Sequence, residues 1–212
     1  MAKYPNGDTF EGYYIDGIRE GRGIYRYAST GEKYDGEWIK NLKHGIGRMS
    51  YMRKGKPNGE YNGFWENGRR HGEGVMNYAN GDVYSGWWKF GEKEGTGTYT
   101  AKATGMKLFG EWTAGQMTKG RWVYPNGMYF EGSFENNKPK GEGVWVFKNG
   151  NRLEGTYEQK PKGAGEEEEA PPEEEDEEAA AANASKKPKV DLLWHSHTNI
   201  TESAHKINSV EQ

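Results

Sequence analysis

Short segments in which aromatic residues alternate with glycine recur along the chain. In Tyr61-Asn62-Gly63-Phe64-Trp65 the two outer rings and the glycine between them fall on one face of an extended strand. A second kind of segment places glycine before alternating rings, as in Gly143-Val144-Trp145-Val146-Phe147. Asn-Gly pairs such as Asn67-Gly68 lie between the two segments and favour tight turns. Each unit of this pattern therefore predicts one β-hairpin.

The hairpin pattern is an internal repeat. It starts at residues 10, 34, 61, 84, 108, 130 and 153, and residues 4–9 match the end of a unit whose beginning is missing. The fifth unit departs from the pattern at Thr118-Lys119-Gly120, where we expect a distorted turn. A single hairpin is marginally stable, whereas stacked hairpins share a continuous apolar face. The sequence predicts an all-β fold over residues 1–165, an elongated single-layer antiparallel meander of about seven hairpins.

Composition suggests that this thin array binds a partner. The chain has 212 residues with 8 Trp, 14 Tyr, 7 Phe and 32 Gly, but only 33% hydrophobic residues, too few for a thick two-layer core. Because one side of a single sheet has no second layer, we expect part of the ring ladder to be exposed to a partner. A helix or extended segment along a ring-lined trough is the simplest ligand. The residues expected to contact it are Tyr34, Trp38, Tyr61, Trp65, Tyr84, Trp88, Trp112, Phe130, Phe134 and Trp145.

Charge divides the chain into a basic array and an acidic tail. Residues 1–165 carry 25 − 19 = +6 and residues 166–212 carry 4 − 13 = −9. The acidic, Ala-rich and Lys-rich linker 166–189 lacks apolar residues, so we expect a disordered tail that adds little stability. The segment 190–212 contains one apolar cluster, Leu192, Leu193 and Trp194, which is expected to dock either on a neighbouring protein or on the array. A charge of +6 over the array is too small to predict nucleic-acid binding.

Candidate chemistry is sparse, and we expect neither catalysis nor a cofactor. The Gly-x-Gly pairs lack the third glycine and the helix of a nucleotide site. His44 and His71 occupy a repeat position where other units have Glu or Lys, which favours a turn role. His195 and His197 provide two potential metal ligands without a third, so no metal site is expected. The chain has no Cys, and its first residues do not resemble an apolar signal segment, which predicts an intracellular protein.

The pattern Tyr-x-Gly-x-Trp-x-x-Gly-x-x-His-Gly-x-Gly, with its period of about 23 residues, resembles the MORN (membrane occupation and recognition nexus) repeat. Residues 4–12, residues 136–147 and the acidic tail from Glu166 are similar to the small MORN-repeat subunits of the ciliary radial spoke head. This resemblance implies a structural scaffold subunit of the axoneme in the cytoskeleton of a cilium or flagellum. It implies partners among the other radial spoke head proteins, within a larger hetero-oligomer.

The repeat also allows a different function, namely an adaptor that binds anionic phospholipid membranes. Several basic residues fall in equivalent turns and are candidates to contact lipid headgroups along one edge of the array. A solvated loop edge is the simpler interpretation, so membrane attachment is not the expected function. The residues concerned are Arg19, Lys43, Arg69, Arg70, Lys93 and Lys138.

Overall fold

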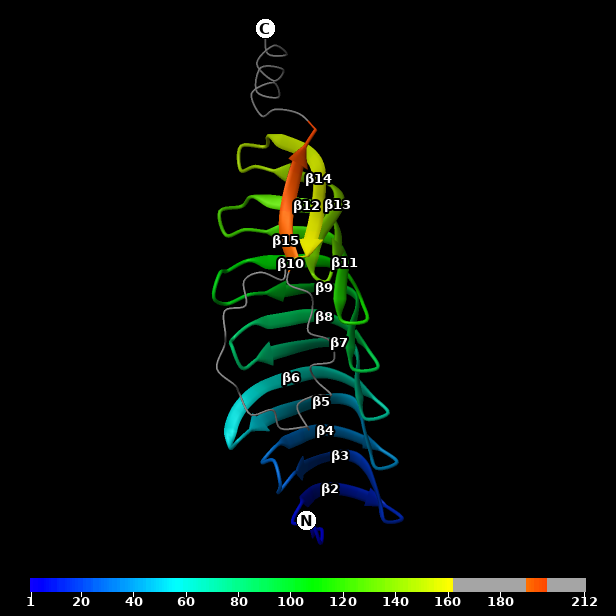
Figure 1. Cartoon of the computed structure of the whole chain (residues 1–212). Helices are drawn as coiled ribbons and strands as arrows, with labels where there is room; N and C mark the ends of the chain where they lie inside the picture. Colours follow the sequence, from blue (N-terminus) through cyan, green and yellow to red (C-terminus); the bar gives the residue numbers. More distant parts are fainter. Residues whose placement is uncertain (162–189, 198–212) are drawn as a thin grey trace.

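The computed structural model describes residues 1–161 and 190–197. They form one open antiparallel sheet in which strands pair in chain order, without a crossover. Figure 1 shows the strands stacked as rungs from the N-terminal end to the C-terminal end. The predicted all-β, single-layer meander is therefore confirmed. The strands are β1 (Ala2–Lys3), β2 (Thr9–Ile15), β3 (Ile18–Arg26), β4 (Lys33–Ile39), β5 (Leu42–Arg53), β6 (Lys56–Glu66), β7 (Arg69–Tyr78), β8 (Val83–Lys89), β9 (Glu92–Thr100), β10 (Lys107–Thr113), β11 (Gln116–Val123), β12 (Tyr129–Glu135), β13 (Lys138–Val146), β14 (Arg152–Pro161) and β15 (Val190–Ser196).

The register of the strands aligns glycines across the sheet. Gly63 on β6 pairs with Gly47 on β5 and with Gly74 on β7, and the same pairing continues in both directions. The aligned residues, called the glycine row below, are Gly12, Gly23, Gly36, Gly47, Gly63, Gly74, Gly86, Gly97, Gly110, Gly120, Gly132, Gly143 and Gly155. Because glycine has no side chain, the row leaves room for aromatic rings to lie directly against the backbone.

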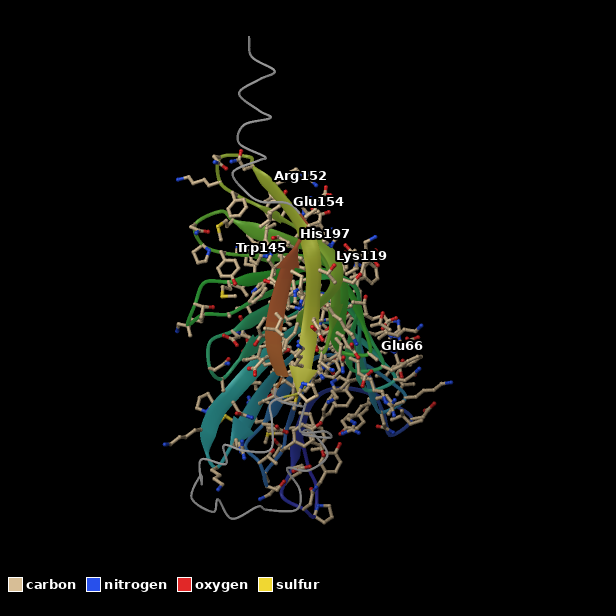
Figure 2. All side chains as sticks on the ribbon, turned by 45° about the horizontal axis from the view of Figure 1, so that its top comes forward. Glu66, Lys119, Trp145, Arg152, Glu154 and His197 are labelled. Atoms are coloured by element: carbon tan, nitrogen blue, oxygen red, sulfur yellow. The ribbon has the colours of Figure 1, made fainter. Side chains whose placement is uncertain are left out.

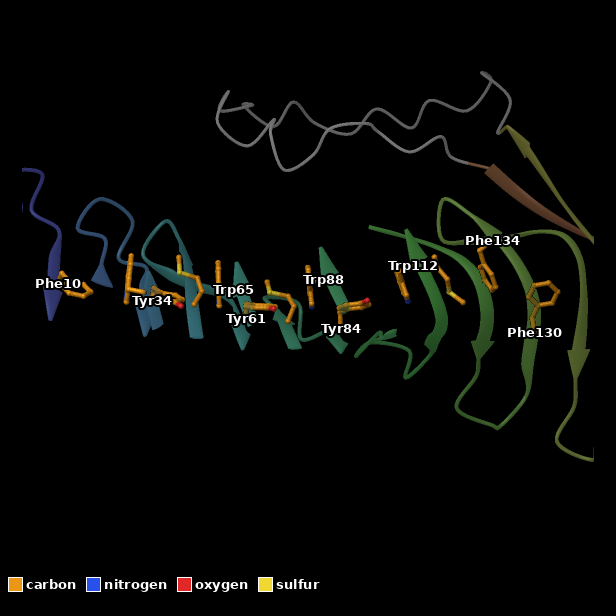
Figure 3. Packing of buried hydrophobic residues seen from close by; sticks show 13 residues of the cluster. Phe10, Tyr34, Tyr61, Trp65, Tyr84, Trp88, Trp112, Phe130 and Phe134 are labelled. Atoms are coloured by element: carbon orange, nitrogen blue, oxygen red, sulfur yellow. The ribbon is translucent and has the colours of Figure 1, made fainter. Parts of the chain in front are cut away.

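The core lies on one side of the sheet, called the ring face below. The first ring of a hairpin, such as Tyr61, lies over the glycine row, and the second ring, such as Trp65, stands beside it. Tyr61 also contacts Trp88 of the next hairpin, and both contacts are edge-to-face at 5.3 Å between ring centroids. Figure 3 shows these rings in a single line along the array. The core is thus a ladder of rings in which each hairpin packs on the next.

Two classes of turn alternate at the two long edges of the sheet. Within a hairpin the turn has two residues, both with positive φ, as in Asn67 (φ 48°) and Gly68 (φ 80°). This geometry matches the right-handed twist of the strands. Between hairpins the turn is longer, and a glycine amide closes it with a hydrogen bond. The amide of Gly81, for example, donates to the carbonyl of Tyr78 at 2.9 Å.

The fifth hairpin differs from the prediction in one respect. Its two-residue turn, Ala114-Gly115, has the same positive φ values as the other hairpins, so the turn itself is regular. The register shift that interrupts the other hairpins is smaller here: it is one residue between Glu111 and Trp112, compared with two residues between Gly63 and Trp65 of the third hairpin. This shift places Met117 opposite Trp112 in the core, where it is fully buried.

The C-terminal tail is not wholly separate from the array. Each predicted unit start lies on the first strand of a hairpin, from β2 to β14. The acidic linker 166–189, for which we expected disorder, lies outside the described residues. Residues 190–196, however, form β15 and pair with β14 from Pro161↔Val190 to Gly155↔Ser196. Backbone pairing and Trp194 therefore attach these residues of the tail to the sheet.

Candidate partner-binding surfaces

The rings expected to contact a partner are instead buried by the chain itself. Nine of the ten predicted contact residues are at most 6% exposed, and Trp145 is half-buried against the same core. They pack edge to face along the ladder, so their surface area is buried between neighbouring hairpins. The expectation that this ladder is the contact surface is therefore corrected. The nine are Tyr34, Trp38, Tyr61, Trp65, Tyr84, Trp88, Trp112, Phe130 and Phe134.

Polar atoms of the core rings are also bound within the chain. The hydroxyl of Tyr61 donates to the carbonyl of Phe64 at 3.0 Å. The indole Nε1 of Trp65 donates to the carbonyl of Gly47, in the preceding hairpin, at 3.1 Å. The same bond links Trp88 to Gly74 at 3.2 Å. Buried Tyr and Trp side chains are stable only when these groups find partners, so the rings serve as links between hairpins.

Four basic residues lie on the ring face rather than along a free turn edge. They occupy one repeat position, on β3, β5, β7 and β9, and each lies over the indole of the next hairpin. The Arg70 guanidinium is 4.4 Å from the Trp88 centroid, and one of its nitrogens donates to the carbonyl of Gly91 at 2.7 Å. These contacts stabilise the stack through cation–π attraction. The set, called the cation row below, is Arg19, Lys43, Arg70 and Lys93.

Two buried carboxylates close the longer turns. The Tyr25 hydroxyl donates to Asp8 at 2.7 Å, and the Ala28 amide donates to the other carboxylate oxygen at 2.8 Å. Asp82 receives the same pair of bonds, from the Tyr99 hydroxyl and from the Lys102 amide. The tyrosine bonds lower the pKa of both carboxyl groups, because they stabilise the ionised form. These residues fix the turns at the sheet edge.

The opposite side of the sheet carries exposed apolar side chains that the sequence analysis missed. Ile46, Phe64, Trp87 and Phe109, called the apolar stripe below, are 46–54% exposed. They line a groove of about 570 Å³ whose floor includes backbone of the glycine row. Phe64 and Trp87 occupy the variable position between glycine and the second ring of their motifs, and strand alternation turns that position away from the core. This alternation is the signal that predicts their exposure.

The groove has one charged side chain among its lining residues, Glu73. Glu73 is exposed, lies directly opposite Trp87 on the neighbouring strand, and has no ion-pair partner within residues 1–161 and 190–197. A large apolar surface with one uncompensated carboxylate suits a ligand that is apolar with a nearby basic group. This side of the sheet can therefore bind a protein segment without any rearrangement of the core.

The tail residues expected to dock lie at the C-terminal end of the sheet. Trp194 contacts Tyr157 at 4.9 Å and Phe130 at 5.9 Å between centroids, and Leu192 is half-buried on the same face. Leu193 points to the other face and is 36% exposed. The amide of His197 donates to the carbonyl of Glu154 at 2.9 Å, and Figure 2 shows both residues at this end of the molecule. Of the two alternatives left open by the sequence, the structure shows docking on the array.

The described part of the chain offers no group of three or more His, Cys, Asp or Glu side chains suited to a metal ion. The two histidines expected in the repeat turns lie instead on strands β5 and β7, two or more residues beyond the turn. The Nδ1 atom of His71 lies 3.1 Å from a carboxylate oxygen of Glu66, and its ring packs against Phe90. His44 contributes its carbonyl to the hydroxyl of Tyr34 at 3.3 Å. Within the same residues, no helix is long and apolar enough to cross a membrane.

Comparison with known protein families identifies the repeat. The MORN repeat matches six segments, at residues 10–31, 34–52, 61–83, 84–102, 109–129 and 130–152. These segments begin at or next to six of the seven predicted unit starts, and the start at residue 153 lies outside them. A comparison with curated proteins finds no match. Each matched segment coincides with one hairpin of the sheet, and together the segments cover more than half of the chain. The chain therefore belongs to the MORN-repeat family.

Proposed function

We propose that the protein is a non-catalytic scaffold subunit that binds another protein through the apolar stripe. One observation carries this proposal: Ile46, Phe64, Trp87 and Phe109 are half exposed on one side of a rigid sheet, around one groove. Exposed aromatic clusters of this kind are typical of binding surfaces, and aromatic residues often dominate the energy of an interface. MORN repeats fit a structural or binding role of this type.

An amphipathic helix laid across the strands fits the stripe. Phe64 and Trp87 lie two strands apart, on β6 and β8, which corresponds to about 9.6 Å at the usual strand spacing. Residues seven apart on a helix are separated by about 10.5 Å along its axis. A helix with apolar residues at this interval places one side chain against each hairpin. A Lys or Arg beside that apolar row would meet Glu73.

The assembly that we propose is the radial spoke head of the ciliary or flagellar axoneme, with other spoke head proteins as partners. The resemblance of residues 4–12 and 136–147 to spoke head MORN subunits supports this assignment. An elongated sheet with a binding surface along its length suits a fixed architectural position, since one side holds the core and the other holds the partner.

Replacing Phe64 and Trp87 together by Thr tests the contact surface. Thr96 and Thr98 already occupy the same face of β9, so the strand tolerates this residue. We expect recovery of spoke head proteins from ciliary extract, measured by mass spectrometry, to fall about thirty-fold, as for loss of a hot spot. The matched control changes Ile39 and Leu42, which are 42% and 46% exposed outside the groove, to Thr and should bind normally.

Two results would overturn the proposal. If the Phe64 and Trp87 variant recovers the same proteins as the unchanged chain, the apolar stripe is not the contact surface. If no spoke head protein is recovered while the folded protein floats with phosphatidylserine liposomes, the function is membrane attachment. Circular dichroism of each variant should match the unchanged chain, because the replaced side chains contribute little to the core.

A further inference from the structure

The cation row forms part of a second surface, on the ring face and independent of the apolar stripe. Lys43 and Arg70 lie directly opposite Trp38 and Trp65 in the sheet register, and Arg19 holds the same place opposite Tyr14. The corresponding position of the fifth and sixth hairpins is apolar, with buried Met117 and Pro139. The first four hairpins therefore differ from the rest by carrying one cation each.

Three of these cations have no ion-pair partner in the part of the chain that the structure describes. No carboxylate of residues 1–161 and 190–197 forms an ion pair with Arg19, Lys43 or Arg70. The Nε atom of Arg19 is buried without a hydrogen-bond partner. Burial also lowers the pKa of Lys43, since it removes water from the charged group. An incoming carboxylate would add the direct ion pair that these three cations do not make with the described residues.

Tyrosines form the other wall of this surface. Tyr51, Tyr78 and Tyr99 surround a hollow of about 490 Å³ that Arg70 also lines, together with two Asn side chains. The Arg70 side chain is half-buried, and its guanidinium lies against the Trp88 ring and not free in solvent. A single extended chain can enter a hollow of this kind, whereas the flat surface of a bilayer meets projecting cations more easily. The surface thus favours a peptide over a lipid headgroup.

The spacing of the cations specifies the ligand. Arg19, Lys43 and Arg70 lie on β3, β5 and β7, two strands apart, which corresponds to about 9.6 Å between neighbours. Three residues of an extended polyproline II chain complete one turn and span about 9.3 Å, so every third side chain lies on the same side. We propose that the ring face of the first four hairpins binds an extended acidic segment of a partner protein, with a carboxylate at every third residue. This site ends at the fifth hairpin, where Met117 replaces the cation.

The test measures binding of a synthetic twelve-residue peptide with glutamate at every third position. Residues 166–178 of the chain itself carry ten carboxylates, so the peptide is titrated into the full chain and into a full-length variant with these ten changed to Asn or Gln. We expect fluorescence anisotropy to show that the peptide binds at least to the full-length variant. Lys43→Met, which introduces the residue found at the equivalent position 117, should weaken it about ten-fold, as for loss of one charge-assisted contact.

Controls separate this site from general attraction between charges. Arg22→Gln, on the opposite face, should change the affinity less than about two-fold, because an exposed distant charge is screened. A peptide of the same composition with its glutamates consecutive should bind more weakly than the spaced peptide. The proposal is overturned if neither full-length protein binds the spaced peptide, or if Lys43→Met and Arg22→Gln have equal effects. It is also overturned if Lys43→Met abolishes binding to phosphatidylserine vesicles but leaves peptide binding unchanged.

Discussion

Glycine in the glycine row is required by the rings that lie over it. A Cβ atom on Gly74 would be 2.2 Å from the hydroxyl oxygen of Tyr61 and 2.5 Å from the adjacent ring carbon. On Gly63 it would be 2.5 Å from the Cα of Gly74, which is backbone and cannot rotate away. Each glycine thus permits both the ring position and the close approach of strands. The repeat keeps this residue because no other side chain fits.

Gly74→Ala should therefore lower the free energy of unfolding by about 2–3 kcal/mol, since overpacking forces the Tyr61 ring out of its position. In thermal unfolding followed by circular dichroism, this corresponds to a decrease in Tm of at least about 5 °C for a chain of this size. Gly68→Ala is the matched control: it has no atom within 4 Å of the added methyl and incurs only the strain of φ +80°. Equal losses for the two variants would contradict the packing argument.

The sequence predicted the ring positions but not their burial. Alternation places Tyr61, Gly63 and Trp65 on one face, and the structure agrees. It does not show that Tyr61 also contacts Trp88 of the next hairpin, because that contact depends on register between strands far apart in the chain. The exposed apolar surface therefore lies on the opposite face, at Phe64 and Trp87, rather than on the ring face.

At the level of the hairpin, turn geometry is uniform although turn sequence is not. Asn67-Gly68 is the pair that sequence rules favour for two positive φ values, and it was predicted. Lys40-Asn41, Phe90-Gly91 and Ala114-Gly115 adopt the same geometry with a poorer first residue. The register of the flanking strands imposes the turn in these hairpins, which is why the local sequence alone does not reveal it.

Ala114→Asn should stabilise the protein, because Asn tolerates the positive φ of this position better than Ala does. We expect a gain of about 0.5–1 kcal/mol, seen as an increase in Tm of about 2–4 °C. The reciprocal variant, Asn67→Ala, places Ala at the same turn position of the third hairpin and should lose a similar amount. A turn imposed wholly by the strands, with no local preference, would instead leave both melting temperatures unchanged.

At the scale of the whole molecule, the C-terminal end of the sheet must cover the last apolar layer of the array. A repeat array requires terminal units that cover the last apolar layer. At the C-terminal end, Trp194 lies over Gly155, at the place where other hairpins put the first ring of their own unit. Leu153, at the ring position of the last unit, is smaller than the Tyr or Phe found in most others. The sequence could not assign this role to Trp194, because 28 residues separate β14 from β15.

Truncation after Pro161 should therefore destabilise the array, contrary to the expectation that the tail contributes little. Loss of β15 exposes the ring of Tyr157 and the unpaired edge of β14, at a cost of about 2 kcal/mol and a decrease in Tm of about 4–8 °C. An open edge also favours intermolecular pairing, so sedimentation velocity should detect association that increases with concentration. Truncation after His197, which retains β15, should alter neither measurement.

Trp194→Ser in the full chain separates the loss of the ring from the loss of strand pairing. It removes the ring but keeps the pairing, so Tm should fall without association. An unchanged Tm after truncation at Pro161 would show that β15 does not stabilise the array.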